Sequence, residues 1–296
     1  MYAMRLEYKY LVPNRSLPQV RQAIAPFAVA DRYMLGKPGG YTVRSIYFDT
    51  SEGQSYDDKQ AGVEARNKVR IRGYNSLHRH ATIFLEIKRK QGPFVSKNRA
   101  PVACEHLAPL LASGDVDRYV RPKTGFPNAP HDSRRFLFHV YRLNLRPTAL
   151  IVYEREAYEN RLGFPLRITF DKYVRSAPFP ALDELFDEGR LSHALPGYFI
   201  LEVKLPDDAA FPAWLKRTIR RFEFQPMALS KYAICLESQG ITHRPSGYGT
   251  MRFSRHVRNS VHERERMSKW AKFTYRYPPQ LLDQFERYKS QKIELR

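Results

Sequence analysis

The sequence predicts an α+β fold in which an antiparallel β-barrel has a charged interior and helices packed outside it. Several strand-like segments alternate charged with apolar residues, as in residues 68–72 and 85–90. Side chains on a strand point to opposite faces in turn, so each such segment has one ionic and one apolar face. The chain also carries 50 Lys and Arg against 30 Asp and Glu, a formal charge of +20. Closing the strands into a barrel would bring the ionic faces together.

A charged tripeptide recurs in these segments. Glu-x-Lys, with an apolar or aromatic middle residue and a preceding Leu, occurs at residues 7–9, 86–88 and 202–204. Lys97 and Arg99 extend the cationic series, although a solvated loop has the same composition. A half-solvated antiparallel sheet can show this alternation too, but the recurrence favours a shared ionic interior. Such an interior needs a polyanionic ligand, because unpaired buried charges are strongly destabilising.

The predicted strands combine β-branched and aromatic residues with a two-residue alternation. They cover residues 5–12, 41–49, 68–72, 85–90, 148–158, 166–173 and 199–205. Pro13 ends the first strand, and the bend at residues 73–76 makes the third and fourth an antiparallel hairpin. The turn-rich residues 159–163 join the fifth and sixth into a second hairpin. The apolar start of the last strand predicts burial on both of its faces.

The predicted helices carry apolar residues at three- and four-residue spacing. They cover residues 18–30, a short segment through Tyr56 capped by residues 49–51, residues 104–112, 132–144 and 182–188, a segment carrying Trp214 to Phe222, and one from Ser230 towards Gly240. Ser16 is the expected cap of the first, and Leu143 is expected to be buried by the fourth. Ser230 and Lys231 begin the last helix, whose free N–H groups make them a candidate phosphate-binding corner. An ordinary Ser cap beside a solvated Lys is the alternative.

The cysteines and the N-terminus indicate the compartment. Cys104 and Cys235 are far apart and show no metal-type spacing, so both are predicted to be reduced core residues. The N-terminus lacks a signal-peptide core, and no apolar run approaches the ~20 residues that a membrane helix needs. We therefore expect a soluble, cytoplasmic protein.

The character of the chain changes after residue 243. Residues 1–243 carry the predicted strands, whereas residues 244–296 interleave Arg and Lys with aromatic residues. This C-terminal extension predicts two helices, at about residues 257–273 and 279–293. It can bind nucleic acid or an anionic surface, or it packs its aromatic side chains on the domain and leaves its charges in solvent.

An ordered series of short motifs resembles a known family. The series LEYKY, TVRSIYFDT, VRIRGY, FLEIK, SKNRAPV, IVYERE, LRITFD, ILEVK and ALSKYAICLE spans residues 4–240. It resembles the VTC domain, the catalytic polyphosphate polymerase domain of the triphosphate tunnel metalloenzyme superfamily, which is related to CYTH proteins. The resemblance implies an antiparallel β tunnel lined with Lys and Arg. Such a tunnel binds a nucleoside triphosphate with a divalent metal and moves its γ-phosphate onto a growing inorganic polyphosphate chain.

The resemblance also implies roles for individual residues. The cations that match the family's phosphate ligands, here assigned to catalysis, are Lys9, Arg70, Arg72, Lys88, Lys97, Arg155, Arg167 and Lys231. Lys204 joins this catalytic set, and Arg99, Tyr153 and Ser230 are assigned to substrate binding. Glu202 matches the family's metal-binding carboxylate, and Glu86 and Glu7 are further candidates to hold Mn²⁺ or Mg²⁺. Glu7 and Glu86 fit equally well as partners of cations across the sheet.

One departure bears on the reaction. Tunnel hydrolases of this superfamily open with Glu-x-Glu-x-Lys, whereas this chain has Arg5, Glu7 and Lys9 at these positions. The loss of a carboxylate favours a polyphosphate polymerase over a triphosphatase or short-chain polyphosphatase. A non-catalytic module that binds polyphosphate or nucleic acid is the third alternative. The sequence also shows no SPX domain or membrane helix of the kind that accompanies this domain in eukaryotic assemblies. A membrane-protein partner, membrane association through such a partner, and the oligomeric state are left open.

Overall fold

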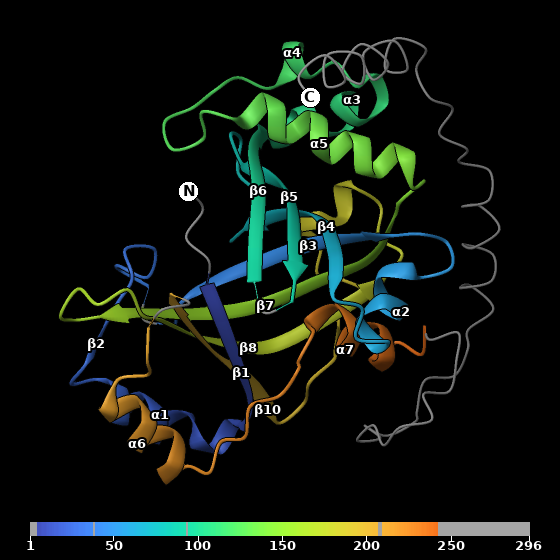
Figure 1. Ribbon diagram of the computed structural model, residues 1–296. Helices are drawn as coiled ribbons and strands as arrows, with labels where there is room; N and C mark the ends of the chain where they lie inside the picture. The colour runs from blue at the N-terminus through green and yellow to red at the C-terminus, as the bar shows by residue number, and fades with distance from the viewer. Residues whose placement is uncertain (1–4, 38, 93, 207–208, 242–296) are drawn as a thin grey trace, which may run out of the picture.

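The computed structural model describes residues 5–37, 39–92, 94–206 and 209–241 (Figure 1). In these residues the chain forms a ten-stranded antiparallel sheet in the order β1-β10-β8-β7-β3-β4-β5-β6, with β2 beside β7 and β9 beside β8. The strands are β1 Arg5–Pro13, β2 Ala28–Ala30, β3 Tyr41–Asp49, β4 Ala65–Tyr74, β5 Thr82–Gln91, β6 Phe94–Ala103, β7 Arg146–Asn160, β8 Arg167–Pro178, β9 Ser192–His193 and β10 Tyr198–Pro206.

Helices lie around this sheet (Figure 1). They are α1 Leu17–Ile24, α2 Gln54–Gln60, α3 Leu107–Ser113, α4 Val116–Tyr119, α5 Ala129–Arg142, α6 Ala213–Arg221 and α7 Lys231–Ser238, with 3₁₀ turns at Asn14–Ser16, Cys104–His106 and Asp183–Phe186. Within the described residues, none of these helices combines the length and the apolar character that a membrane crossing requires. The α+β class and the predicted core strands are confirmed.

The prediction of a closed barrel is wrong. β1 and β6 are the two edges of the sheet and do not pair with each other. The outer edge of β6 is occupied by α5 instead, because Asp132 accepts hydrogen bonds from the Arg99 backbone N–H and from the Asn98 side chain. Two residues further along the same edge, Pro101 has no N–H to donate. A covered, proline-bearing edge cannot add another strand, so the sheet curls without closing.

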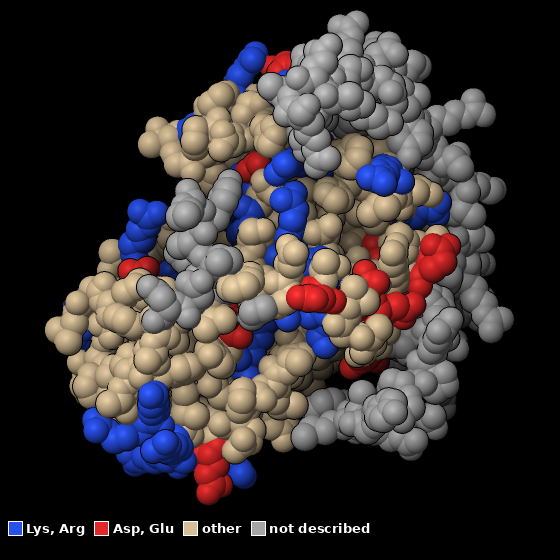
Figure 2. All heavy atoms as spheres, viewed as in Figure 1, with Lys and Arg blue, Asp and Glu red and all other residues tan. Residues whose placement is uncertain are grey.

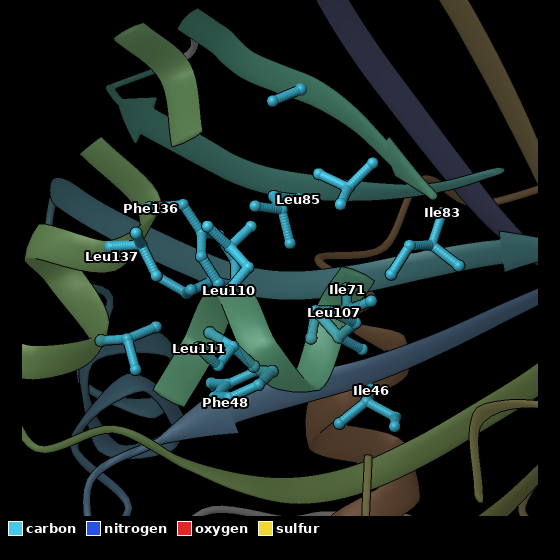
Figure 3. Packing of buried hydrophobic residues seen from close by; sticks show 14 of the residues in the cluster. Ile46, Phe48, Ile71, Ile83, Leu85, Leu107, Leu110, Leu111, Phe136 and Leu137 are labelled. Carbon is cyan, nitrogen blue, oxygen red and sulfur yellow. The ribbon is translucent and has the colours of Figure 1, made fainter. Parts of the chain in front are cut away.

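Apolar side chains cover the outer face of the sheet. Ile46, Ile71 and Leu85 belong to a buried cluster that packs against Leu110 of α3 and Phe136 of α5 (Figure 3). A second cluster joins β1, β8 and β10 to α1 and α6. Both clusters use the apolar face that the alternation predicts, so the ionic faces of the same strands are turned inward.

Helix α7 packs on the inner face of the sheet. Tyr232 stacks on Tyr47 of β3 with ring centroids 5.3 Å apart, and its hydroxyl donates a 2.6 Å hydrogen bond to Asp49. Asp49 also accepts from the backbone N–H groups of Ser55 and Tyr56, so it caps α2 as well. The predicted cap at residues 49–51 is thus made by Asp49 and Thr50, but α2 begins at Gln54 and runs on to Gln60.

Several predicted helices differ from those observed. The helix predicted for residues 18–30 ends at Ile24, because Pro26 lacks an N–H to continue the ladder, and Ala28–Ala30 forms β2. Ser16 stands at the N-cap of α1 but makes no side-chain cap hydrogen bond. Leu143, expected to be buried, lies beyond the end of α5 and is 43% exposed. The predicted helix 182–188 is only a 3₁₀ turn.

The remaining predictions concern the thiols and the C-terminal extension. Cys104 is partly buried, Cys235 is buried, and both are free thiols, as predicted. The helices predicted in the extension at residues 244–296 lie outside the described residues, as does the side chain of Arg5.

Candidate functional site

A cavity of about 220 Å³ opens on the inner face of the curled sheet. Strands β1, β3, β4, β5, β6, β7 and β10 form its walls together with α2 and the N-terminus of α7. Among the described residues, eleven Lys and Arg side chains and two carboxylates line it. The cations are Lys9, Lys59, Arg66, Lys68, Arg70, Arg72, Lys88, Lys90, Arg155, Lys204 and Lys231, and the carboxylates are Glu7 and Glu202. Figure 2 shows Lys and Arg gathered in the recessed centre of the viewed face.

Strands β4 and β5 supply about half of these cations. Their register places Arg66 opposite Lys90 and Lys68 opposite Lys88. Val69, which lies between the inward-facing Lys68 and Arg70 of β4, points to the outer core and is buried there. Like charges directly opposite each other destabilise a sheet, so this hairpin needs anions on its ionic face.

Glu86 supplies one such anion. It is fully buried, and its carboxylate lies 2.7 Å from Arg70 Nη2, 2.5 Å from Lys97 Nζ, 3.1 Å from Arg99 Nε and 3.9 Å from Arg72 Nη1. Burial alone would raise the pKa of Glu86, but these four cations hold it well below its usual range. A carboxylate surrounded in this way is a counter-ion of the sheet, with Oε2 accepting from Arg70 and Oε1 facing Lys97 and Arg99.

Glu202 holds a second group of cations together. Its carboxylate lies 3.3 Å from Lys204, 3.6 Å from Arg155 and 3.8 Å from Lys9. Burial would raise the pKa of Glu202, but Lys204, Lys9 and Lys231 hold it well below its usual range. These contacts are longer than those of Glu86, so the Glu202 carboxylate is less firmly committed to its partners.

Asp171 of β8 anchors the deepest cations. Both of its oxygens accept from Arg155, at 2.6 and 2.7 Å, and Lys231 Nζ lies 2.5 Å from Oδ2. Lys231 is the first residue of α7, and Ser230 caps this helix by accepting from the Ala233 N–H at 3.3 Å. Lys68 donates a 2.7 Å hydrogen bond to the same Ser230 hydroxyl. The predicted Ser cap is therefore present, and its helix N-terminus lines the cavity.

Two lysines of the cavity have lowered pKa values. Burial lowers the pKa of Lys68 well below its usual value, and repulsion from Lys9 and Lys88 adds to the effect. Burial also lowers the pKa of Lys88 to about 8, although the neighbouring Glu7 opposes this shift. A bound anion would raise the pKa of both lysines and so favour their charged forms.

The structure brings most of the predicted site residues together. Those that line the cavity are Lys9, Arg70, Arg72, Lys88, Arg155, Lys204, Lys231, Tyr153, Ser230, Glu202 and Glu7. Glu86, Lys97 and Arg99 are not among the lining residues and meet one another behind Arg70. Arg99 also stacks on Phe84, with its guanidinium 3.6 Å from the ring centroid.

Arg167 is held away from the cavity. Its guanidinium lies 2.5 Å from Asp31 Oδ2 and 3.1 Å from Glu159 Oε1, and it is not a lining residue. Two carboxylates from outside the inner face thus satisfy this cation, a pairing that the strand alternation could not reveal.

Sequence reasoning missed several lining residues. Lys68 and Lys90 share the inward face with predicted residues of β4 and β5, so the alternation already contained them. Tyr47 shares its strand with buried apolar residues and accepts a 2.7 Å hydrogen bond from Arg70. Lys59 sits on α2, and no sequence pattern indicated that α2 would border the cavity.

The carboxylates of the cavity fit a divalent cation. No group of three or more His, Cys, Asp or Glu in the described part of the chain is arranged to hold a metal ion. Glu7 and Glu202 nevertheless both line the cavity, and the charge of Glu202 acts to raise the pKa of the Glu7 carboxyl, against the neighbouring cations that hold it below its usual value. Mg²⁺ and similar ions are commonly held by one or two carboxylates plus substrate phosphates and water. The residues present match that donor set.

Comparisons with known proteins identify the family. The chain resembles a solved structure of a putative adenylyl cyclase from Hippeastrum, described as having a dominant triphosphatase activity, with 15% identity and a TM-score of 0.42 over 83% of this chain and 100% of that one. It also resembles the Mediator head module of Schizosaccharomyces pombe, with 9% identity and a TM-score of 0.37 over 74% of this chain and 91% of that one. No curated protein shows a significant match. The family model of the VTC domain matches residues 4–239. The chain therefore belongs to the VTC domain family, and this membership supports a function on triphosphate or polyphosphate.

Proposed function

We propose that this chain is a metal-dependent polyphosphate polymerase that transfers the γ-phosphate of ATP to a growing inorganic polyphosphate chain. The observation that carries the proposal is the charge of the cavity, where eleven Lys and Arg side chains face two carboxylates. A single nucleoside triphosphate offsets only part of this excess. A polyphosphate chain carries a negative charge on every unit and offsets the remainder as it extends along the wall.

The arginines fit the demands of phosphoryl transfer. This reaction passes through a loose transition state, so catalysis depends on in-line positioning and on stabilising the charge of the phosphoryl oxygens. Arg70, Arg72 and Arg155 present planar forks that bind phosphate oxygens in two places. Glu86 and Asp171 fix these guanidinium groups from behind, so little reorganisation is needed when substrate binds.

The lysines and the helix N-terminus supply further charge. Lys9, Lys88 and Lys204 provide point charges along the wall. Lys231 stands at the start of α7, where the helix dipole adds a partial positive charge.

The acceptor in this mechanism is the terminal phosphate of the chain. No protein nucleophile is needed, and the Ser230 hydroxyl already accepts hydrogen bonds from Lys68 and the Ala233 N–H. Glu7 and Glu202 would hold Mn²⁺ or Mg²⁺, which supplies Lewis-acid charge to the bridging phosphate oxygens when it is bound.

The test is incubation of the purified chain with ATP and Mn²⁺, with and without a short polyphosphate primer, followed by phosphorus NMR. The proposal predicts a growing signal from internal phosphates together with ADP. Orthophosphate without internal phosphate would instead identify a triphosphatase. No turnover with Mn²⁺, or with Mg²⁺ in its place, would leave a polyanion-binding module.

A further inference from the structure

Three cations lie together at one end of the cavity. Arg66 at the start of β4 lies opposite Lys90 at the end of β5, and Lys59 of α2 borders the same part of the wall. These three residues, here called the outer basic end, are each partly exposed. Lys68 lies two residues after Arg66 on the same face of β4, and it donates a hydrogen bond to the Ser230 hydroxyl deeper in the cavity.

The outer basic end lacks the counter-ions found deeper in the cavity. Within the described residues, no Asp or Glu oxygen forms an ion pair with Lys59, Arg66 or Lys90. The one hydrogen bond of an Arg66 guanidinium N–H goes to the Val63 carbonyl. By contrast, Arg155 and Lys231 of the interior share Asp171, at 2.6 and 2.5 Å.

The neighbouring charges repel one another. Burial lowers the pKa of Lys90, and Arg66 and Lys9 lower it further, against a smaller opposing effect of Glu7. The pKa of Lys59 is likewise lowered by burial and then by Arg66, although the more distant Glu237 opposes this shift. A cluster of mutually repelling cations gains more from a bound anion than a compensated cluster does.

The opposite end of the strands is neutralised. Arg167 begins β8, at the end where β10 finishes, and it is paired with Asp31 and Glu159. Lys204, opposite Arg167 in the ladder, lies 3.3 Å from Glu202. Among the described residues, Arg167 and Lys204 are thus paired with carboxylates whereas Lys59, Arg66 and Lys90 are not, which gives the inner face a charge gradient.

From this gradient we propose that the outer basic end is a binding subsite for the polyphosphate chain beyond the phosphates held by the interior arginines. The proposal rests on the proposed function and adds a direction to it. The growing chain leaves the cavity past Lys59, Arg66 and Lys90 and not past Arg167. The subsite would set how strongly the protein prefers long chains over short ones.

The test compares the affinity for two probes, tripolyphosphate and size-fractionated long-chain polyphosphate, in chelator and at physiological salt so that no turnover occurs. The variant combines Lys59→Ala, Arg66→Ala and Lys90→Ala. We expect the dissociation constant for tripolyphosphate divided by that for the long chain to fall about tenfold or more in this variant. The reason is that three phosphate contacts available only to the long chain are lost.

Helix α6 offers a matched control. Lys216, Arg217 and Arg220 are exposed on its outer side and do not line the cavity, so their triple Ala variant removes the same charge elsewhere. An unchanged preference in the outer variant, or an equal loss in the α6 variant, would overturn the subsite. If the triple variant does not fold, Lys90→Gln alone should lower the ratio about twofold to threefold, and an unchanged ratio would overturn the subsite.

The outcome is separable from that of the proposed function. Chain growth by the wild-type chain is scored independently by phosphorus NMR. A selective loss of long-chain binding without any chain growth would refute the polymerase and keep the subsite. Chain growth by the wild-type chain, together with an unaltered chain-length preference in the outer variant, would support the polymerase and refute the subsite.

Discussion

Lys88 of β5 and Glu7 of β1 form a 2.7 Å ion pair. Strand β1 is one edge of the open sheet, and β5 is the neighbour of the other edge, β6. The side chains of Lys88 and Glu7 are 26% and 14% exposed. No backbone ladder joins β1 to β6. The ion pair is therefore a side-chain contact that holds the curled sheet together across the gap where a closed barrel would have a strand pair.

A double-mutant cycle tests this link. Glu7→Gln and Lys88→Met should each destabilise the fold, and their effects should be coupled by about 1 kcal/mol because the two groups contact each other directly. Urea unfolding of the two single variants and the double variant gives the coupling energy. Strictly additive effects would show that the pair contributes nothing to holding the edges.

Glu86→Gln should destabilise the protein by about 3 kcal/mol, because it leaves four cations around a neutral group in a buried site. Urea unfolding measures the loss. The same variant should bind tripolyphosphate more tightly in chelator, since uncompensated cations gain more from an anion. Unchanged stability and weaker binding would contradict the assignment of Glu86 as a counter-ion.

Binding of tripolyphosphate without metal should take up protons. The pKa of Lys68 is well below its usual value and that of Lys88 is about 8 in the free protein, and a bound anion raises both. Affinity should therefore decrease as the pH rises above about 8, because binding must then be accompanied by protonation. Calorimetry in buffers of different ionisation enthalpy measures the uptake. Lys68→Met should reduce it, and an uptake of zero in the wild-type chain would contradict this reading of the cavity.

Tyr232→Phe should misplace Lys231. The Tyr232 hydroxyl donates to Asp49, which also caps α2, so the variant leaves a buried carboxylate oxygen short of a partner. We expect a loss of about 1–2 kcal/mol in stability and a decrease in kcat of about tenfold with a smaller change in KM, because positioning is affected more than charge. A variant that loses stability but keeps the wild-type kcat would confine Tyr232 to folding.

Periodicity predicted the inner and outer faces of this sheet well. Arg70 and Arg72 face the cavity while Val69 and Ile71 are buried outside, as the alternation requires. The strand Tyr41–Asp49 was predicted with the boundaries observed. These successes share a cause, since a two-residue repeat is fixed by the strand backbone itself.

Long-range partners were not predictable from the sequence. The open edge arises because Asp132 of α5 caps β6, a contact across 33 residues. Arg167 does not line the cavity because it pairs with Asp31, which is 136 residues away in the sequence. Lys59 enters the site because α2 is tied to β3 and α7 through Asp49. Each of these outcomes depends on how separate elements pack, which no local pattern encodes.

The partition of a labelled γ-phosphate tests the central claim most directly. The chain is incubated with γ-labelled ATP, Mn²⁺ and a short polyphosphate primer, and the early label in polymer is compared with that in orthophosphate. We expect most label to enter polymer and Glu202→Gln to abolish this transfer. Glu105 is an exposed carboxylate outside the cavity, so Glu105→Gln should leave the transfer intact. Label that appears only in orthophosphate, or transfer that survives in Glu202→Gln, would contradict the claim.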